Sequence, residues 1–180
     1  MNGTKLAGGP TQDEIMAVSL FKLGLLDTDT VLEIGCGTGK VSVAMAKTVK
    51  NVYSLDKRPD AVSLATETAR GAGMDNIEFF CMDAMDFLKE DQVFDCAFLG
   101  GTQHISEILP VLAKKVKRTI VINAVMVSTL ERAVTSLKGL GIFTEVVQVQ
   151  VSRSYDIAGS VMFRPIDPVY IIVARGAACS

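Results

Sequence analysis

A chain of 180 residues, 49% of them hydrophobic, can bury one full core but is too short for two comfortable domains, so we expect a single domain over residues 1–180. The formal net charge is −2 and the basic residues are scattered, which argues against nucleic acid as a partner. The first residues, MNGTKLAGGP, lack the apolar core of a signal peptide, and no run reaches the roughly 20 apolar residues that span a bilayer, so we expect a cytoplasmic protein without a membrane partner.

The first predicted element is a helix within PTQDEIMAVSLFKLGL. Thr11 fits its N-cap, Glu14 stands where a capping box places its acid, and Gly24 fits near its C-terminal end. Strand-like apolar runs follow at TVLEIG, NVYSLD, NIEFFC, FDCAFLG, RTIVINAV, TEVVQVQVS and PVYIIVA. The later helices are predicted at Lys40–Val49, Asp60–Arg70, Ala84–Lys89, Ile105–Val116 and Ser128–Leu140. This alternation predicts a doubly wound α/β sheet.

The last two predicted strands are connected differently from the others. The segment between them, RSYDIAGSVMFRPID, has no convincing helical face, so a parallel crossover is disfavoured and the pair is expected to be antiparallel. A mainly parallel seven-stranded sheet that ends in a C-terminal antiparallel hairpin resembles the Rossmann-like fold of class I methyltransferases.

A glycine-rich turn, VLEIGCGTGK, follows the first predicted strand. Such a turn lets a ligand approach the backbone, and the next helix N-terminus favours a negative group. Dinucleotide-binding turns usually read GxGxxG, whereas this turn reads GxGxG and has Lys40 where the last glycine would stand. The turn instead resembles the first motif of methyltransferases that use S-adenosyl-L-methionine (AdoMet), with Glu33 as a supporting acid behind it. The AdoMet contacts that this resemblance implies are Gly35, Cys36, Gly37, Thr38 and Gly39.

Two further strand ends carry acids. Asp56 ends the second strand, where a carboxylate can accept both ribose hydroxyls of a nucleoside, as in NAD and AdoMet proteins. The segment CMDAMDF after the third strand resembles the methyltransferase segment that holds adenine, through the Asp83 side chain and the Ala84 amide. Either acid alone could be a solvated turn residue or a helix cap, since Asp is favoured there. The ordered set favours AdoMet, and NAD remains the alternative.

Three segments outside the cofactor motifs narrow the family. GGPTQDEI, LGGTQHISEIL and GSVMFRPIDPVYII together resemble the cobalt-precorrin C-15 methyltransferases (decarboxylating) of anaerobic corrin synthesis, over most of the chain. The resemblance implies methylation of cobalt-precorrin-6B at carbon-15, with loss of carbon dioxide from the carbon-12 acetate chain, in a homotetramer. It also implies an AdoMet contact at Thr11, which is compatible with the helix cap.

The resemblance places a tetrapyrrole substrate beside Gly100 and Gly101, where missing side chains would let a large ring approach; an ordinary strand-to-helix turn is the alternative. Its carboxylates favour arginines, and Arg153 and Arg164 are the candidates, although both could be surface charges. Tyr155 and Met162 in the same segment could face the macrocycle or a neighbouring subunit.

No catalytic acid or base stands out. Methyl transfer from a sulfonium chiefly needs proximity and orientation, and His104, the single histidine, is either an acid–base group or a solvated loop residue. The four cysteines show no CxxC pair, so we expect no metal site and reduced, mostly buried thiols, including a packed Cys36. The rival functions are an RNA or protein methyltransferase and a non-catalytic AdoMet-binding protein.

Overall fold

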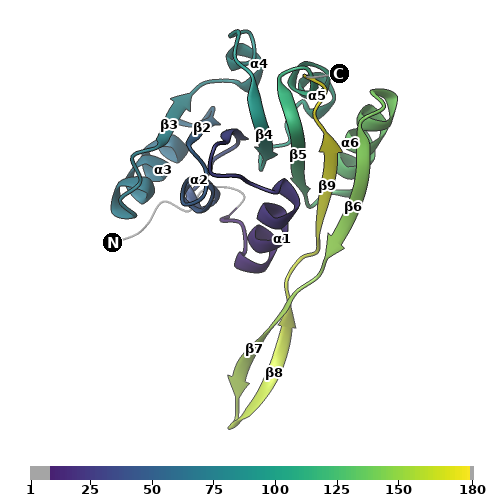
Figure 1. Ribbon diagram of the computed structural model, residues 1–180. Helices are drawn as coiled ribbons and strands as arrows, with labels where there is room; N and C mark the ends of the chain where they lie inside the picture. The colour runs from purple at the N-terminus through teal and green to yellow at the C-terminus, as the bar shows by residue number, and fades with distance from the viewer. Residues whose placement is uncertain (1–8, 179–180) are drawn as a thin grey trace.

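The computed structural model describes residues 9–178 (Figure 1). Gly8 and Cys179, which take part in the expectations above, lie outside the described residues. The helices are α1 (Asp13–Leu23), α2 (Lys40–Ala46), α3 (Pro59–Gly71), α4 (Ala84–Phe87), α5 (Ile105–Ala113) and α6 (Val127–Gly139). The strands are β1 (Thr30–Ile34), β2 (Asn51–Asp56), β3 (Ile77–Cys81), β4 (Phe94–Leu99), β5 (Val116–Ala124), β6 (Phe143–Val149), β7 (Ser152–Ile157), β8 (Ser160–Pro165) and β9 (Val169–Arg175).

Seven strands form the main sheet, in the order β3-β2-β1-β4-β5-β9-β6. The first five in this order pair in parallel, whereas β9 is antiparallel to both β5 and β6. The predicted α/β fold and the antiparallel pairing of the last two main-sheet strands are therefore confirmed. The order reverses direction between β1 and β4, and in open sheets of this kind ligands bind at the carboxyl ends of the strands beside that point.

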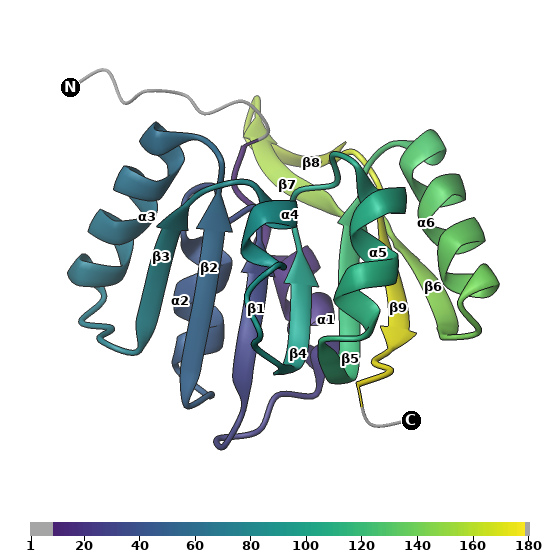
Figure 2. The same cartoon turned by 90° about the horizontal axis from the view of Figure 1, so that it is seen from above.

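Helices cover both faces of the sheet, as the view from above shows (Figure 2). In β1, Val31 packs with the cluster that α1 and α2 cover, while the next residue, Leu32, packs with the cluster under α4, α5 and α6. Successive side chains of a strand point to opposite faces, so a strand buried on both sides is apolar at successive positions. The unbroken apolar runs of the sequence have this origin.

Several predicted boundaries differ from the structure. The N-cap of α1 is Gln12 rather than Thr11, and its side chain makes no capping hydrogen bond; Thr11 stands one residue outside the helix. Gly24 is the C-cap with φ +59°, as predicted. Helix α5 ends at Ala113 because Val116 already pairs with Phe94 as the first residue of β5. Helix α2 stops at Ala46 and α4 at Phe87, each earlier than the sequence suggests, while α3 and α6 begin one residue earlier.

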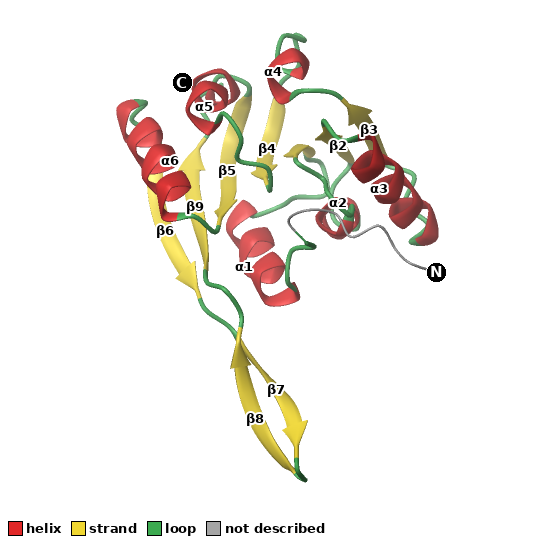
Figure 3. Ribbon diagram, turned by 180° about the vertical axis from the view of Figure 1, so that it is seen from behind, coloured by secondary structure: helices red, strands yellow, loops and turns green. Residues whose placement is uncertain are grey.

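The segment between β6 and β9 forms a second, two-stranded sheet, β7–β8. This hairpin extends away from the body of the molecule, beyond the helices that cover the main sheet (Figures 1 and 3). The register pairs Arg153 with Arg164 and Tyr155 with Met162, and Gly159 turns the chain with φ +75°.

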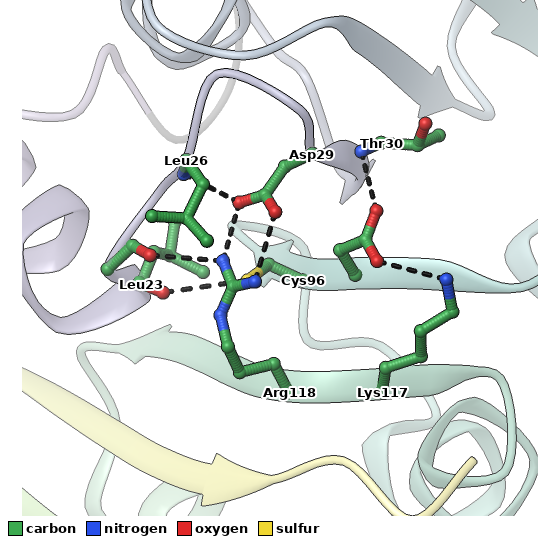
Figure 4. A network of polar contacts seen from close by, with 9 residues as sticks. Leu23, Leu26, Asp29, Thr30, Cys96, Lys117 and Arg118 are labelled. Atoms are coloured by element: carbon green, nitrogen blue, oxygen red, sulfur yellow. Dashed lines mark hydrogen bonds and ion pairs between the residues drawn. The ribbon is translucent and has the colours of Figure 1, made fainter. Parts of the chain in front are cut away.

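The amino-terminal edge of the main sheet is held by an ion pair (Figure 4). The Arg118 guanidinium donates to both carboxylate oxygens of Asp29, at 3.0 and 2.5 Å, and to the Gly24 carbonyl at 3.0 Å. Asp29 also accepts from the Leu26 amide at 2.8 Å, so both oxygens of this buried carboxylate have hydrogen-bond donors. The contacts join the start of β5 to the loop that leads from α1 into β1, at the edge away from the glycine turn.

Candidate functional site

Two adjoining cavities open at the carboxyl ends of the parallel strands. We name them the turn cavity, of about 410 Å³, which is lined in part by Thr11, Gly37 and Asn123, and the strand-end cavity, of about 480 Å³, which is lined in part by Asp56, Asp83 and Ala84. Both are also lined by Gly35, Arg58, Gly100 and Thr102. An elongated ligand can therefore pass from one cavity to the other across the glycine turn.

The three glycines of the turn have different reasons to lack a side chain. A Cβ on Gly35, where φ is +86°, would lie 2.4 Å from the Gly101 nitrogen, and one on Gly39 would lie 2.7 Å from the Ala65 Cα. These two glycines therefore let the turn pack against the β4 loop and against α3. A Cβ on Gly37 would meet nothing within 4 Å, so Gly37 is the position where a ligand can approach the backbone.

The glycines after β4 take part in the same packing. The Gly100 and Gly101 amides both donate to the Ile34 carbonyl at 2.9 Å, and a Cβ on Gly100 would lie 3.1 Å from the Gly35 carbonyl oxygen. Both residues still line the strand-end cavity. The close approach of two loops explains part of their requirement for glycine, and this reason was not visible in the sequence.

Asp56, at the end of β2, is the most heavily hydrogen-bonded carboxylate of the site. Oδ2 accepts from the Gly37 amide at 3.1 Å and from Arg58 Nη2 at 2.8 Å, while Oδ1 accepts from the Arg58 amide at 3.1 Å and from Arg58 Nε at 2.9 Å. Burial opposes ionisation, but the Arg58 guanidinium and the two amides outweigh it and hold the pKa of Asp56 below its ordinary value. Arg58 was not singled out from the sequence, since an arginine after a strand is usually a surface charge.

Asp83 and Ala84 stand beside Asp56 on the wall of the strand-end cavity, as the sequence predicts. Asp83 is the N-cap of α4, and its Oδ1 accepts from the Met85 amide at 2.8 Å. The helix-cap explanation therefore holds for Asp83, and it leaves the second carboxylate oxygen for a ligand.

Glu33 lies behind the glycine turn and also lines the turn cavity. It is 1% exposed, and its Oε2 accepts hydrogen bonds from the Ser42 hydroxyl and, at 2.6 Å, from the Ser54 hydroxyl. Burial raises the pKa of this carboxyl more than the two serine hydrogen bonds lower it. Glu33 therefore lies in the supporting position behind the turn that the sequence predicts.

The residues before α1 close the turn cavity from one side. Lys40, at the start of α2, donates to the Thr11 carbonyl at 3.1 Å and forms an ion pair with Asp13 at 2.7 Å. Lys40 occupies the place of the last glycine in a dinucleotide turn, and here it ties the N-terminal segment to the glycine turn. The predicted Thr11 lies in the cavity wall, although not as the helix cap.

Asn123, near the end of β5, is a further residue of the turn cavity that the sequence reasoning missed. Its Oδ1 accepts from the Ser19 hydroxyl at 3.0 Å, and its Nδ2 is the one buried side-chain nitrogen or oxygen without a hydrogen-bond partner within residues 9–178. A polar side chain inside the apolar run VINAV, at the carboxyl end of a strand, is the signal that could have found it.

The two predicted substrate arginines lie outside both cavities, on the β7–β8 hairpin. Arg153 forms an ion pair with Glu14 of α1 at 2.6 Å, and the Arg164 guanidinium lies 4.9 Å from the centre of the Tyr155 ring. His104 lines the strand-end cavity as the exposed N-cap of α5, with Nδ1 3.4 Å from a Glu107 oxygen.

The thiols are not poised for chemistry at this site. Burial raises the pKa of Cys36 to about 12, which keeps it protonated, so the prediction of a packed side chain is confirmed. Cys96 is buried as expected, but Cys81 is exposed, because it ends β3, the edge strand of the sheet.

Within residues 9–178 no cluster of His, Cys, Asp and Glu is arranged to hold a metal ion. In the same range no helix is both long and apolar enough to cross a membrane.

Residues 31–121, from β1 into β5, match a protein family described as a methyltransferase domain. Over 176 residues the chain is 46% identical to the probable cobalt-precorrin-6B C(15)-methyltransferase (decarboxylating) of Methanosarcina mazei, a match that covers 94% of this chain and 95% of that protein.

Two solved structures share the fold over nearly the whole chain. The precorrin 8W decarboxylase of Methanobacterium thermoautotrophicum is 27% identical with a TM-score of 0.89, and the match covers 92% of this chain and 91% of that one. The precorrin-6Y C5,15-methyltransferase of Geobacter metallireducens is 28% identical with a TM-score of 0.89, and the match covers 96% of this chain and 94% of that one.

Proposed function

The chain belongs to the family of cobalt-precorrin-6B C(15)-methyltransferases (decarboxylating), and from this we propose that it methylates a cobalt-precorrin at carbon-15 and removes the carboxyl of the carbon-12 acetate chain. The observation that carries the proposal is a match at 46% identity over 94% of the chain. The cavities of the chain, set at the switch point of a methyltransferase fold, agree with it. AdoMet is the methyl donor.

The residues of the two cavities fit AdoMet in an extended form. We propose that Asp56 accepts the ribose hydroxyls and that Asp83 and the Ala84 amide hold adenine in the strand-end cavity. The methionine part would lie against the glycine turn, with Gly37 leaving space for it and Thr11 closing the cavity. This fit is supported by the open space at Gly37, since any Cβ there would occupy the ligand's path.

AdoMet brings an activated methyl group, so the chain itself need only bind, orient and exclude water. Gly35 and Gly101 approach each other closely at the edge where the two cavities meet, and the substrate would approach the methyl group there. No general base is assigned. Departure of the acetate carboxyl is favoured where that group is poorly solvated while the other carboxylates are held.

We propose that Arg153 and Arg164 hold carboxylates of the tetrapyrrole. They are directly opposed across the β7–β8 pair, and like charges in that position destabilise a hairpin unless an anion lies near them. Arg153 is balanced by Glu14, whereas Arg164 makes no ion pair within the described residues. An anionic substrate over this face would supply the missing charge.

We further propose that the active form is a homotetramer, in which hairpins from other copies complete the surface around the substrate, and that the enzyme works in the cytoplasm on a small molecule rather than a nucleic acid. The apolar side chains exposed on β8 support the assembly.

The test of the function is an anaerobic incubation of the full chain with AdoMet and cobalt-precorrin-6B, followed by mass spectrometry of the tetrapyrrole. We expect a gain of one methyl group together with the loss of one carboxyl group. A gain of the methyl group without loss of the carboxyl group would indicate that another protein carries out the decarboxylation. An unchanged tetrapyrrole, with AdoMet binding shown by calorimetry, would contradict the proposal and direct attention to RNA or protein acceptors, or to a binding protein without turnover.

The arginine assignment is tested by Arg164→Ala. Tetrapyrrole affinity is expected to fall about tenfold, because a charge-assisted hydrogen bond of roughly 1.5 kcal/mol is lost, while AdoMet affinity stays nearly the same. Fluorescence titration with the tetrapyrrole and calorimetry with AdoMet measure the two separately. Loss of AdoMet binding in this variant would refute the placement of Arg164 on the substrate side.

A further inference from the structure

The Asp56 carboxylate has no acceptor position to spare. An ionised carboxylate offers about four lone-pair positions, and four donors already use them at distances between 2.8 and 3.1 Å. Two of these donors are backbone amides, those of Gly37 and Arg58, and two are nitrogens of the Arg58 guanidinium. A ligand that needs Asp56 must replace some of them.

The two kinds of donor differ in how easily they leave. The amides are fixed by the glycine turn and by Arg58 itself, which is the N-cap of α3 with Pro59 next in the chain. The guanidinium is at the end of a long side chain that is 36% exposed, whereas the Asp56 side chain is 5% exposed. Arg58 also lines both cavities, so it is placed to turn from one toward the other.

The ribose of a nucleoside competes with the Arg58 guanidinium for the Asp56 carboxylate. Its two hydroxyls donate two hydrogen bonds, which match in number the two positions that Nε and Nη2 of Arg58 hold. We propose that Arg58 is an exchangeable partner of Asp56: its guanidinium and the ribose hydroxyls compete for the same positions on the carboxylate, so the guanidinium must be displaced when a nucleoside binds. The inference rests on the proposed role of Asp56 in AdoMet binding.

Arg58 is therefore a positioning residue, and its effect is to lower the affinity for the cofactor. Displacement of the guanidinium costs the ion pair with Asp56, and this cost is subtracted from the binding free energy of every ligand with ribose hydroxyls. The amides of Gly37 and Arg58 keep the carboxylate oriented after the guanidinium leaves, so the ribose meets a carboxylate that is already in place. A residue that only supported Asp56 would have the opposite effect, because its removal would disorder the carboxylate and weaken binding.

The experiment compares Arg58→Met with the wild-type chain by calorimetry, using adenosine and 2′,3′-dideoxyadenosine as probes. Methionine keeps an apolar stem and leaves the backbone amide unchanged. We expect adenosine to bind roughly 3-fold to 10-fold more tightly to the variant, the range that a partly exposed ion pair supplies, while dideoxyadenosine affinity stays unchanged. Arg58→Lys, which keeps the charge without the two-pronged donor, should give a smaller gain.

The matched control is Arg70→Met, which removes an exposed arginine from the last turn of the same helix, and we expect it to change neither affinity. Thermal unfolding of each variant tests whether any difference in affinity arises from a difference in folded fraction. Unchanged or weaker adenosine binding in Arg58→Met, with wild type preferring adenosine to dideoxyadenosine, would overturn the exchange and leave the ribose role of Asp56 intact. Equal binding of the two nucleosides by wild type and by Asp56→Asn would instead overturn the ribose role, and the exchange with it.

Discussion

Glu33 illustrates how the fold tolerates a single buried residue whose ionisation is unfavourable. The carboxyl group is almost fully buried, and the hydrogen bonds from the Ser42 and Ser54 hydroxyls both reach the same oxygen. Because its folded pKa lies above the ordinary 4.5, the native state binds this proton more tightly than the unfolded chain does. The stability that Glu33 contributes is therefore complete below pH 4.5 and is lost as the pH rises from 4.5 to the raised folded pKa.

Glu33→Gln should remove this dependence on pH. Each pKa unit by which the fold raises Glu33 corresponds to about 1.4 kcal/mol, so the wild-type free energy of unfolding should fall across that window and the variant's should fall less. Urea unfolding over a pH series measures both curves. Glu67→Gln, which removes an exposed glutamate from α3, is the control and should keep the wild-type slope. An unchanged slope in Glu33→Gln would show that another group titrates.

Cysteine reactivity follows from exposure. The nucleophile in alkylation is the thiolate, and burial raises the pKa of Cys36 to about 12 and that of Cys96 to about 11. In a Cys179→Ser background, iodoacetamide at about pH 8 should therefore label the exposed Cys81 first. Peptide mass spectrometry at successive times gives the order. Labelling of Cys36 as fast as Cys81 would mean that the glycine turn opens readily.

At the scale of the elements, the glycine turn predicts different outcomes for neighbouring substitutions. Gly35→Ala places a Cβ 2.4 Å from the Gly101 nitrogen at a φ of +86°, and should lower the free energy of unfolding by about 3 kcal/mol. Gly37→Ala meets no atom within 4 Å and should cost only about 1 kcal/mol for its φ of +53°. Its methyl group, however, would enter the turn cavity and weaken AdoMet binding.

Denaturant unfolding and calorimetry with S-adenosylhomocysteine separate the two effects. The expected pattern is a large loss of stability in Gly35→Ala and a loss of affinity out of proportion to stability in Gly37→Ala. Equal losses of stability in the two variants would contradict the assignment of Gly35 to loop packing and Gly37 to ligand approach.

Much of this architecture follows from local patterns. Apolar runs separated by helical segments predict the parallel sheet, and the carboxyl ends of its strands bring Gly37, Asp56 and Asp83 to one edge. The cap of α1 was predicted wrongly because Thr11, Gln12 and Asp13 are consecutive polar residues, and propensity alone does not choose among them. The contact of Gly35 with Gly101 was not predictable, since it depends on how closely two distant loops approach.

At the scale of the whole molecule, the β7–β8 hairpin is the feature least explained by one copy of the chain. All six residues of β8 are exposed, including Val161, Met162 and Phe163, on both faces of a two-stranded ribbon. An isolated two-stranded hairpin is marginally stable in water. The sequence predicted a connection without helical character here, but no local pattern says what covers these side chains. Other copies of the chain are the cover that we propose.

Phe163→Lys tests this assembly. Phe163 is 67% exposed in the single chain, and burying a phenylalanine contributes about 2 kcal/mol per copy, so a lysine there should shift the proposed tetramer toward smaller species. Light scattering on a sizing column measures the mass. Val93→Lys, at a 44% exposed residue in the loop before β4, is the control and should leave the mass unchanged. A wild-type monomer, or a Phe163→Lys tetramer as stable as wild type, would contradict an assembly through the hairpin and would favour the macrocycle as the partner of its apolar faces.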